Sequence, residues 1–137
     1  MTTLFADTSF YVALLNVRDL HHQRALDFLR VPTGQVVTTE YVVVEVGNFM
    51  RRPADRAYFL ALLEDLEHDE NTSLIPSSSE LLAQGVELFR QRPDKSWSIT
   101  DCTSFVVMRE RGITDALTAD VHFRQAGFAA ILLPPPT

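Results

Sequence analysis

Short apolar runs alternate with helical patterns along almost the whole of this 137-residue chain. The apolar runs have the length of strands buried on both faces, whereas the segments between them repeat apolar residues at helical spacing. Strands are predicted at 4–6, 36–39, 72–75, 116–118 and 129–133, and helices at 21–30, 40–52, 55–67, 80–90 and 101–111. Strand and helix in alternation favour βαβ units. The sequence therefore predicts an α/β fold with a mostly parallel five-stranded sheet that helices cover on both sides.

The composition is that of one globular domain, with 46% hydrophobic and 22% charged residues. No linker or repeat interrupts residues 1–133, and a proline-rich tail, 134–137, follows them. A single cysteine, Cys102, excludes an internal disulfide and fits a reducing compartment. The apolar segment 10–15 is too short for a signal peptide or a membrane span. We therefore expect a cytoplasmic protein without membrane association.

The formal net charge of −6 argues against a protein that coats nucleic acid in bulk, because such proteins are usually basic. It does not exclude an enzyme that acts on RNA. Clustered carboxylates would supply much of the negative charge, and bound metal would offset it.

Two aspartates follow predicted strands directly. Asp7 comes after the run 4–6, and Asp120 comes shortly after the run 116–118. Because ligands bind at the carboxyl ends of parallel strands, both carboxylates are expected to face the same crevice. Asp7 has a competing interpretation as the cap of a helix that starts near Phe10, but Ser9 is the better placed cap. Asp115 precedes its strand, so we expect it at the opposite edge of the sheet.

Two further acids lie in predicted helices. Glu45 interrupts an apolar segment and forms a polar stripe with Asn48 and Arg52 at helical spacing, although an ordinary solvated helix face would look similar. The segment 98–101 has the spacing of a capping box, so Asp101 by itself is first interpreted as a cap. A residue in the first turn would still lie at the mouth of the sheet, which makes the two roles compatible.

Buried carboxylates are costly unless they are paired, hydrogen-bonded or bound to a cation. If the fold gathers Asp7, Glu45, Asp101 and Asp120, the simplest partner is a hard divalent metal. Mg²⁺ and Mn²⁺ prefer such oxygen ligands, and four acids would hold one or two ions. Without metal, repulsion among these carboxylates should raise some of their apparent pKa values.

With these residues in place, the chain resembles PIN-domain ribonucleases, and most of all the VapC-type toxins of bacterial toxin–antitoxin pairs. The resemblance covers nearly the whole chain and depends on the order and spacing of four blocks, which are 4–9, 45–48, 97–108 and 116–128. It implies a three-layer α/β/α fold, commonly dimeric, that cleaves RNA with Mg²⁺ or Mn²⁺ and is held inactive by an antitoxin protein. The residues that match the family's catalytic metal ligands are Asp7, Glu45, Asp101 and Asp120, and those that match its small polar residues are Ser9, Asn48 and Thr118.

The RNA backbone requires basic contacts. Arg51 and Arg52 follow the predicted helix of Glu45 and are the first candidates, and two such patches in a homodimer would form one groove.

A metal-independent ribonuclease would need a pair of imidazoles, but the four histidines are not spaced as a pair. A receiver domain would need a lysine after its last strand, and the only lysine is Lys95. The remaining alternative is a catalytically silent PIN-like module that binds a partner protein.

Overall fold

The computed structural model describes residues 2–30 and 34–136, and this part of the chain contains a five-stranded sheet. Every pairing between neighbouring strands is parallel. The strands are β1 (Thr3–Ala6), β2 (Gln35–Thr39), β3 (Thr72–Ile75), β4 (Asp115–Leu117) and β5 (Ala129–Ala130), in the spatial order β3-β2-β1-β4-β5. The predicted α/β fold with a five-stranded parallel sheet is confirmed. Thr137, the last residue of the predicted tail, lies outside the described residues.

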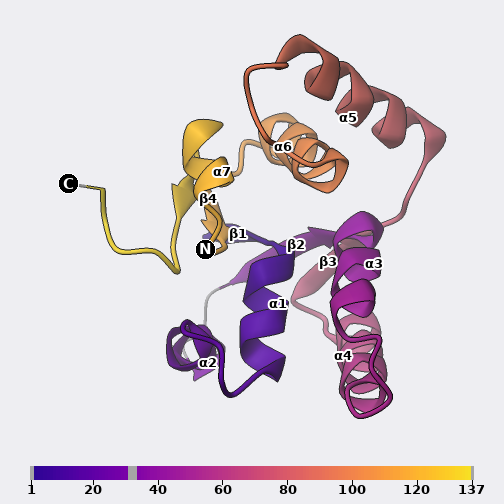
Figure 1. The fold of residues 1–137 in the computed structure, drawn as a ribbon, viewed down its shortest axis with the longest axis vertical. Coiled ribbons are helices and arrows are strands. Elements are labelled where there is room, and N and C mark those ends of the chain that lie inside the picture. Colours follow the sequence, from indigo (N-terminus) through magenta and orange to yellow (C-terminus); the bar gives the residue numbers. More distant parts are fainter. Residues whose placement is uncertain (1, 31–33, 137) are drawn as a thin grey trace.

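Helices cover both faces of this sheet. They are α1 (Thr8–Leu15), α2 (His22–Arg30), α3 (Glu40–Phe49), α4 (Arg56–His68), α5 (Ser79–Gln91), α6 (Ile99–Arg111) and α7 (Val121–Gln125). Figure 1 shows α5 and α6 on one side of the sheet and α1 and α2 on the other. Helix α3 contacts both α1 and α6, so it reaches both layers. None of the helices in the described ranges is long and apolar enough to cross a membrane.

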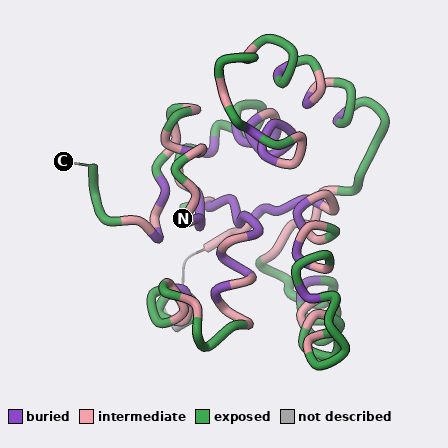
Figure 2. The backbone as a smooth tube through the Cα atoms, viewed as in Figure 1, coloured by how far each residue is buried: buried purple, intermediate pink, exposed green. Residues whose placement is uncertain are grey.

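The core is centred on β1, the middle strand of the sheet. Leu4, Phe5 and Ala6 are buried, and Figure 2 shows buried backbone along the strands and along the helix sides that face them. The ring of Phe123 on α7 lies 6.3 Å from that of Phe5 and 4.9 Å from that of Phe105 on α6. Aromatic packing of this kind adds to the area that these rings bury. It fixes the middle of α6 and the first turn of α7 relative to β1.

The chain changes direction across the sheet between β1 and β4. From β1 it proceeds outward through β2 to β3, and it then returns to the other side of β1 to form β4 and β5. Adjacent parallel strands whose connections leave in opposite directions create a crevice at their carboxyl ends. Asp7 follows β1 at this point, and Thr118 follows β4. Asp115 is the first residue of β4 and therefore lies at the opposite edge, as predicted.

Two predicted elements differ from the structure, and one further helix was not predicted. Helix α3 ends at Phe49 and not at residue 52, because a helix cannot continue into Pro53 without losing a hydrogen bond and clashing with the preceding turn. Strand β5 covers two residues and not 129–133, since it pairs with only the first two residues of β4 before a turn begins. Helix α7 was not predicted, because five residues are too few to show a helical period.

Candidate metal centre

Asp7 links the end of β1 to the beginning of α1. It occupies the N-cap position of α1, but its side chain makes no capping hydrogen bond. Its Oδ2 instead accepts hydrogen bonds from Thr118 Oγ1 at 2.8 Å and from Ser9 Oγ at 3.3 Å. The other oxygen, Oδ1, is buried and has no hydrogen-bond partner within the described part of the chain. One side of this carboxylate is therefore held firmly, and the other side is without a partner.

The environment of Asp7 opposes its negative charge. The pKa of its carboxyl is raised from 3.8 to about 7, mainly because the group is buried, and the neighbouring charges of Asp101 and Asp120 act in the same direction, while the hydrogen bond from Thr118 acts in the opposite one. Asp7 is only 3% exposed, so bulk water does not compensate for the missing partner. A carboxylate of this kind is stabilised by a cation in contact with its free oxygen.

Asp101 lies in the first turn of α6, and its capping role is confirmed. Its backbone N–H donates to Ser98 Oγ at 2.9 Å, and its Oδ2 accepts from the Ser98 N–H at 3.1 Å, which completes the predicted capping box. The side chain is 8% exposed. Burial is the main cause that raises the pKa of Asp101, and the charge of Asp120 acts in the same direction. The capping box and His122 both use Oδ2, and Oδ1 has no hydrogen-bond partner in the described residues.

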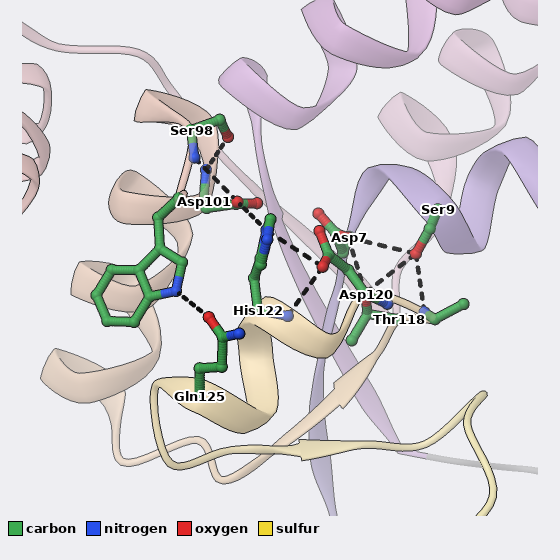
Figure 3. A network of polar contacts seen from close by, with 10 residues as sticks. Asp7, Ser9, Ser98, Asp101, Thr118, Asp120, His122 and Gln125 are labelled. Carbon is green, nitrogen blue, oxygen red and sulfur yellow. Dashed lines mark hydrogen bonds and ion pairs between the residues drawn. The ribbon is translucent and has the colours of Figure 1, made fainter. Parts of the chain in front are cut away.

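Asp120 is the N-cap of α7, where its Oδ1 accepts a hydrogen bond from the His122 N–H at 2.9 Å. The imidazole Nδ1 of His122 lies 3.3 Å from this same oxygen and 3.1 Å from Asp101 Oδ2. Figure 3 shows the ring between the two carboxylates, close to Asp7. One ligand atom from each of Asp101, Asp120 and His122 lies within 4.8 Å of the other two.

Hydroxyl groups connect the two strand ends that carry these acids. Ser9 Oγ and Thr118 Oγ1 are 3.0 Å apart, and the backbone N–H groups of Ala119 and Asp120 donate to them at 2.9 and 3.0 Å. The prediction that Ser9 caps α1 is wrong, because the helix already begins at Thr8. The Ser9 hydroxyl instead bridges to β4, and it thereby fixes the position of Asp7 relative to Asp120.

Glu45 and Asn48 lie on α3, outside the tight group of Asp101, Asp120 and His122. The half-buried Glu45 and the exposed Asn48 line a groove together with Thr100, the residue before Asp101. Glu45, like Asp7, is not among the residues whose ligand atoms approach one another within 4.8 Å in the described chain, but unlike Asp7 it makes no hydrogen bond to the residues around Thr118. Arg51 and Arg52 are exposed just beyond the end of α3. The structure thus assembles Asp7, Asp101, Asp120, Ser9 and Thr118, and it leaves the α3 residues at the rim.

The family model of the PIN domain matches residues 4–129. The chain belongs to the PIN-domain family. It is 31% identical over 129 residues to the 23S rRNA-specific endonuclease VapC20 of Mycobacterium tuberculosis, an alignment that covers 93% of this chain and 97% of that protein.

Solved PIN-domain structures share the fold. The crystal structure of M. tuberculosis VapC20, a toxin that cleaves the sarcin–ricin loop, matches with a TM-score of 0.85 and 27% identity over 96% of this chain and 99% of that one. VapBC2 from Rickettsia felis, bound to a DNA fragment from its promoter, matches with a TM-score of 0.64 at 13% identity, covering 94% and 97%. FitAcB from Neisseria gonorrhoeae matches with a TM-score of 0.62 and 14% identity, over 93% of this chain and 94% of that one. At these identities the last two demonstrate the fold alone.

His122 is the residue of this PIN-domain site that sequence reasoning missed. A metal-independent catalytic role requires a pair of imidazoles, whereas His122 contacts carboxylates. The available signal was its position two residues after Asp120, which brings both side chains to the first turn of one helix. That signal becomes informative only once α7 is known to begin at residue 121.

The donor set fits a divalent cation. It combines the free Asp7 Oδ1, two further carboxylates within charge–charge range of Asp7, and an imidazole. Oxygen-rich sites of this kind suit Mg²⁺ and Mn²⁺, and an added imidazole is compatible with Mn²⁺. A cation near Asp7 Oδ1 would provide the partner that this buried atom otherwise lacks.

Proposed function

We propose that this PIN domain is a divalent-metal-dependent endoribonuclease. The observation that carries the proposal is the asymmetry of Asp7, which has one oxygen fixed by Thr118 and Ser9 and the other buried without a partner next to Asp101 and Asp120. A fold needs no such arrangement for its own stability, since the ionised carboxylate is costly there. The similarity to an RNA endonuclease supports RNA as the substrate.

In this proposal Asp7, Asp101 and Asp120 hold Mg²⁺ or Mn²⁺, with Glu45 contributing from α3. An ion held by these residues would supply a water molecule of lowered pKa as the nucleophile, and it would stabilise negative charge on the departing 3′ oxygen. Thr118 and Ser9 keep the Asp7 carboxylate in one orientation, and His122 spaces the carboxylates of Asp101 and Asp120. Hydrolysis of this kind leaves 5′-phosphate and 3′-hydroxyl ends. Products with 2′,3′-cyclic phosphate ends would contradict it.

The proposal extends to the partners of the protein. The similarity to VapC20, a toxin that cleaves the sarcin–ricin loop, supports an assignment of this chain as the toxin of a toxin–antitoxin pair with a cognate antitoxin. We also propose a homodimer, in which Arg51 and Arg52 of both copies contribute to one RNA groove. These exposed arginines would contact phosphates, as cations do in most complexes with nucleic acids.

The surroundings of other reactive side chains argue against two different mechanisms. His22 Nδ1 lies 2.6 Å from the Ala13 carbonyl oxygen and His68 Nδ1 lies 2.8 Å from that of Glu64, so neither ring faces the carboxylates. Cys102 is buried, and burial raises the pKa of its thiol to about 11. A thiol of this kind is a poor nucleophile at neutral pH.

The test is expression of the wild type, Asp101→Asn and Asp115→Asn in bacteria, followed by mapping of new 5′-monophosphate RNA ends across the transcriptome. Asp115 is a matched control because it is an acid at the opposite end of β4. We expect new ends with the wild type and with Asp115→Asn, and none with Asp101→Asn. Soluble proteins that produce identical end profiles in all three cases would favour a silent binding module.

A further inference from the structure

A groove of about 440 Å³ lies beside the proposed metal centre. Tyr41, Val44, Glu45 and Asn48 of α3 line one side, and Ser77 and Thr100 line the other. This volume falls within the range of about 300–1,000 Å³ that is usual for pockets that bind small ligands. The groove is continuous with the catalytic residues, since Glu45 belongs to its wall and Thr100 immediately precedes Asp101.

The walls of the groove are fixed before any ligand binds. The Tyr41 hydroxyl donates to the Ser78 carbonyl oxygen at 2.9 Å, which holds the ring against the segment after β3. From that segment, the Ser77 N–H and hydroxyl both donate to Glu40 Oε1, at 2.6 and 3.1 Å. These contacts join residues 37 positions apart in the chain. The groove is therefore a preorganised feature and not a gap between mobile side chains.

The chemistry of the groove suits a nucleobase. Val44 is 61% exposed and the ring of Tyr41 is half-buried, so both offer apolar surface to a planar ring. The side-chain amide of Asn48 makes no hydrogen bond within the described part of the chain, although it is at the groove wall. Proteins that recognise single-stranded RNA stack the bases on aromatic side chains and read their edges with polar groups.

Cations continue from the Asn48 end of the groove. Arg51 Nη1 donates to the Asn48 carbonyl oxygen at 2.9 Å, and Arg56 Nε donates to the Arg51 carbonyl oxygen at 2.8 Å. Together with Arg52 they form a group of exposed guanidinium groups, and none of them makes an ion pair with a carboxylate in the described residues. The proposed metal centre, the groove and the arginines thus follow one another along the surface. In that order they would contact the scissile phosphate, a neighbouring base and the next phosphate of one RNA strand.

We propose that this groove binds one unpaired nucleobase next to the scissile phosphate, and that Asn48 determines which base is accepted. The inference rests on the proposed ribonuclease function and adds its specificity. A carboxamide presents one acceptor and one donor side by side, and this pattern complements adenine. A carboxylate only accepts, and it matches bases that present N–H donors, such as cytosine and guanine.

The first experiment measures positional sequence preference with purified protein, Mn²⁺ and a library of unstructured RNA randomised around the cut site. We expect the wild type to prefer adenine at one position beside the cut. Asn48→Asp should change the preference at that position by about tenfold toward cytosine or guanine, because one good base contact discriminates by about this factor. Asn48→Gln should retain adenine, since it keeps the donor and the acceptor. Equal preferences in all three proteins would overturn the assignment, whereas a purely structural role of Asn48 would lower all rates uniformly.

A second experiment fills the groove from its rim with Val44→Trp. We expect at least tenfold slower cleavage with unchanged Mn²⁺ affinity, because the metal ligands are untouched. Val17→Trp is the matched control, since Val17 is also exposed but follows α1 away from the groove. Full activity of Val44→Trp would overturn the groove assignment while leaving the nuclease intact. A wild type that cleaves no RNA with Mn²⁺ would overturn both proposals.

Discussion

The two sides of the proposed site are built in different ways. On the β1–β4 side, Asp7, Asp101 and Asp120 are tied by hydrogen bonds to Ser9, Ser98 and Thr118, and the first two are buried. On the α3 side, Glu45 is half-buried, and Asn48 and the arginines are exposed. The two sides therefore have different proposed roles, in which the rigid side binds the cation and the open side admits the RNA. Rigid support of this kind is what a metal ligand needs, whereas a polymeric substrate needs access.

The largest expected effect on the cleavage rate comes from a substitution on the rigid side. Asp7→Asn should lower the rate of RNA cleavage by about 10³-fold or more, because residues that act as a unit are costly to lose singly. Glu45→Gln should cost less, since Glu45 is only half-buried on α3, whereas Asp7 is buried and held by Thr118. Both rates are measured with a fixed RNA and saturating Mn²⁺. Equal losses in the two variants would contradict the division between the two sides.

Asp7→Asn should also stabilise the metal-free protein against unfolding. The folded-state pKa of Asp7 is raised from 3.8 to about 7, so its protonated form is favoured on folding, and stability is lost as pH rises through this interval. At pH 8 the cost to the wild type is about 4 kcal/mol, and below pH 4 it disappears. In EDTA at pH 8, Asp7→Asn should therefore unfold at a higher urea concentration than the wild type. At pH 4 the two proteins should unfold at nearly the same urea concentration. A difference that does not depend on pH would be inconsistent with a buried, charged Asp7.

Support for the ligands is tested with Thr118→Val. The substitution removes the hydroxyl that donates to Asp7 and accepts from the Asp120 N–H, and it should weaken Mn²⁺ binding by about 10–100-fold. Thr38→Val is the matched control, because Thr38 is equally buried but donates to the Ala6 carbonyl oxygen. Calorimetric titration should give wild-type affinity for Thr38→Val. Equal affinities in all three proteins would show that the hydroxyl network does not support the metal.

The smallest expected effect concerns the open side. Replacing Arg51 and Arg52 by alanine should raise KM several-fold and leave kcat nearly unchanged, because phosphate contacts contribute to binding. The slope of log affinity against log salt should fall by about 1.4 for two lost contacts to single-stranded RNA. Arg109 and Arg111, in the last turn of α6, provide the control pair. A salt slope that is the same for both double variants would remove Arg51 and Arg52 from the RNA path.

The sequence predicted those features of the site that depend on strand ends and on local capping. Asp7 was identified because it follows a buried run, and parallel strands bring their carboxyl ends together. The capping box of Asp101 was identified because its two partners are three residues apart. Both arguments use short-range patterns whose geometry is nearly independent of the rest of the chain.

Contacts across the sheet were not predictable in this way. The Ser9 hydroxyl contacts Thr118, which is 109 positions away, so a local rule assigned it to a helix cap. His122 contacts Asp101 across 21 positions, through a helix too short to recognise. The distance of Glu45 from the aspartates depends on how α3 leans between α1 and α6. Helical periodicity identifies the polar stripe of Glu45, but it does not give that orientation.

The most direct test of the account is the affinity of the purified protein for Mn²⁺, measured by electron paramagnetic resonance of the free ion at pH 7.5. We predict saturable binding by the wild type and by Asp115→Asn, and binding at least 100-fold weaker for Asp7→Asn. Each variant lacks one carboxylate of the wild type. Of the two substituted residues, Asp7 lies in the crevice and Asp115 lies at the opposite edge of the sheet. Equal Mn²⁺ affinity in all three proteins would contradict a metal centre built on Asp7.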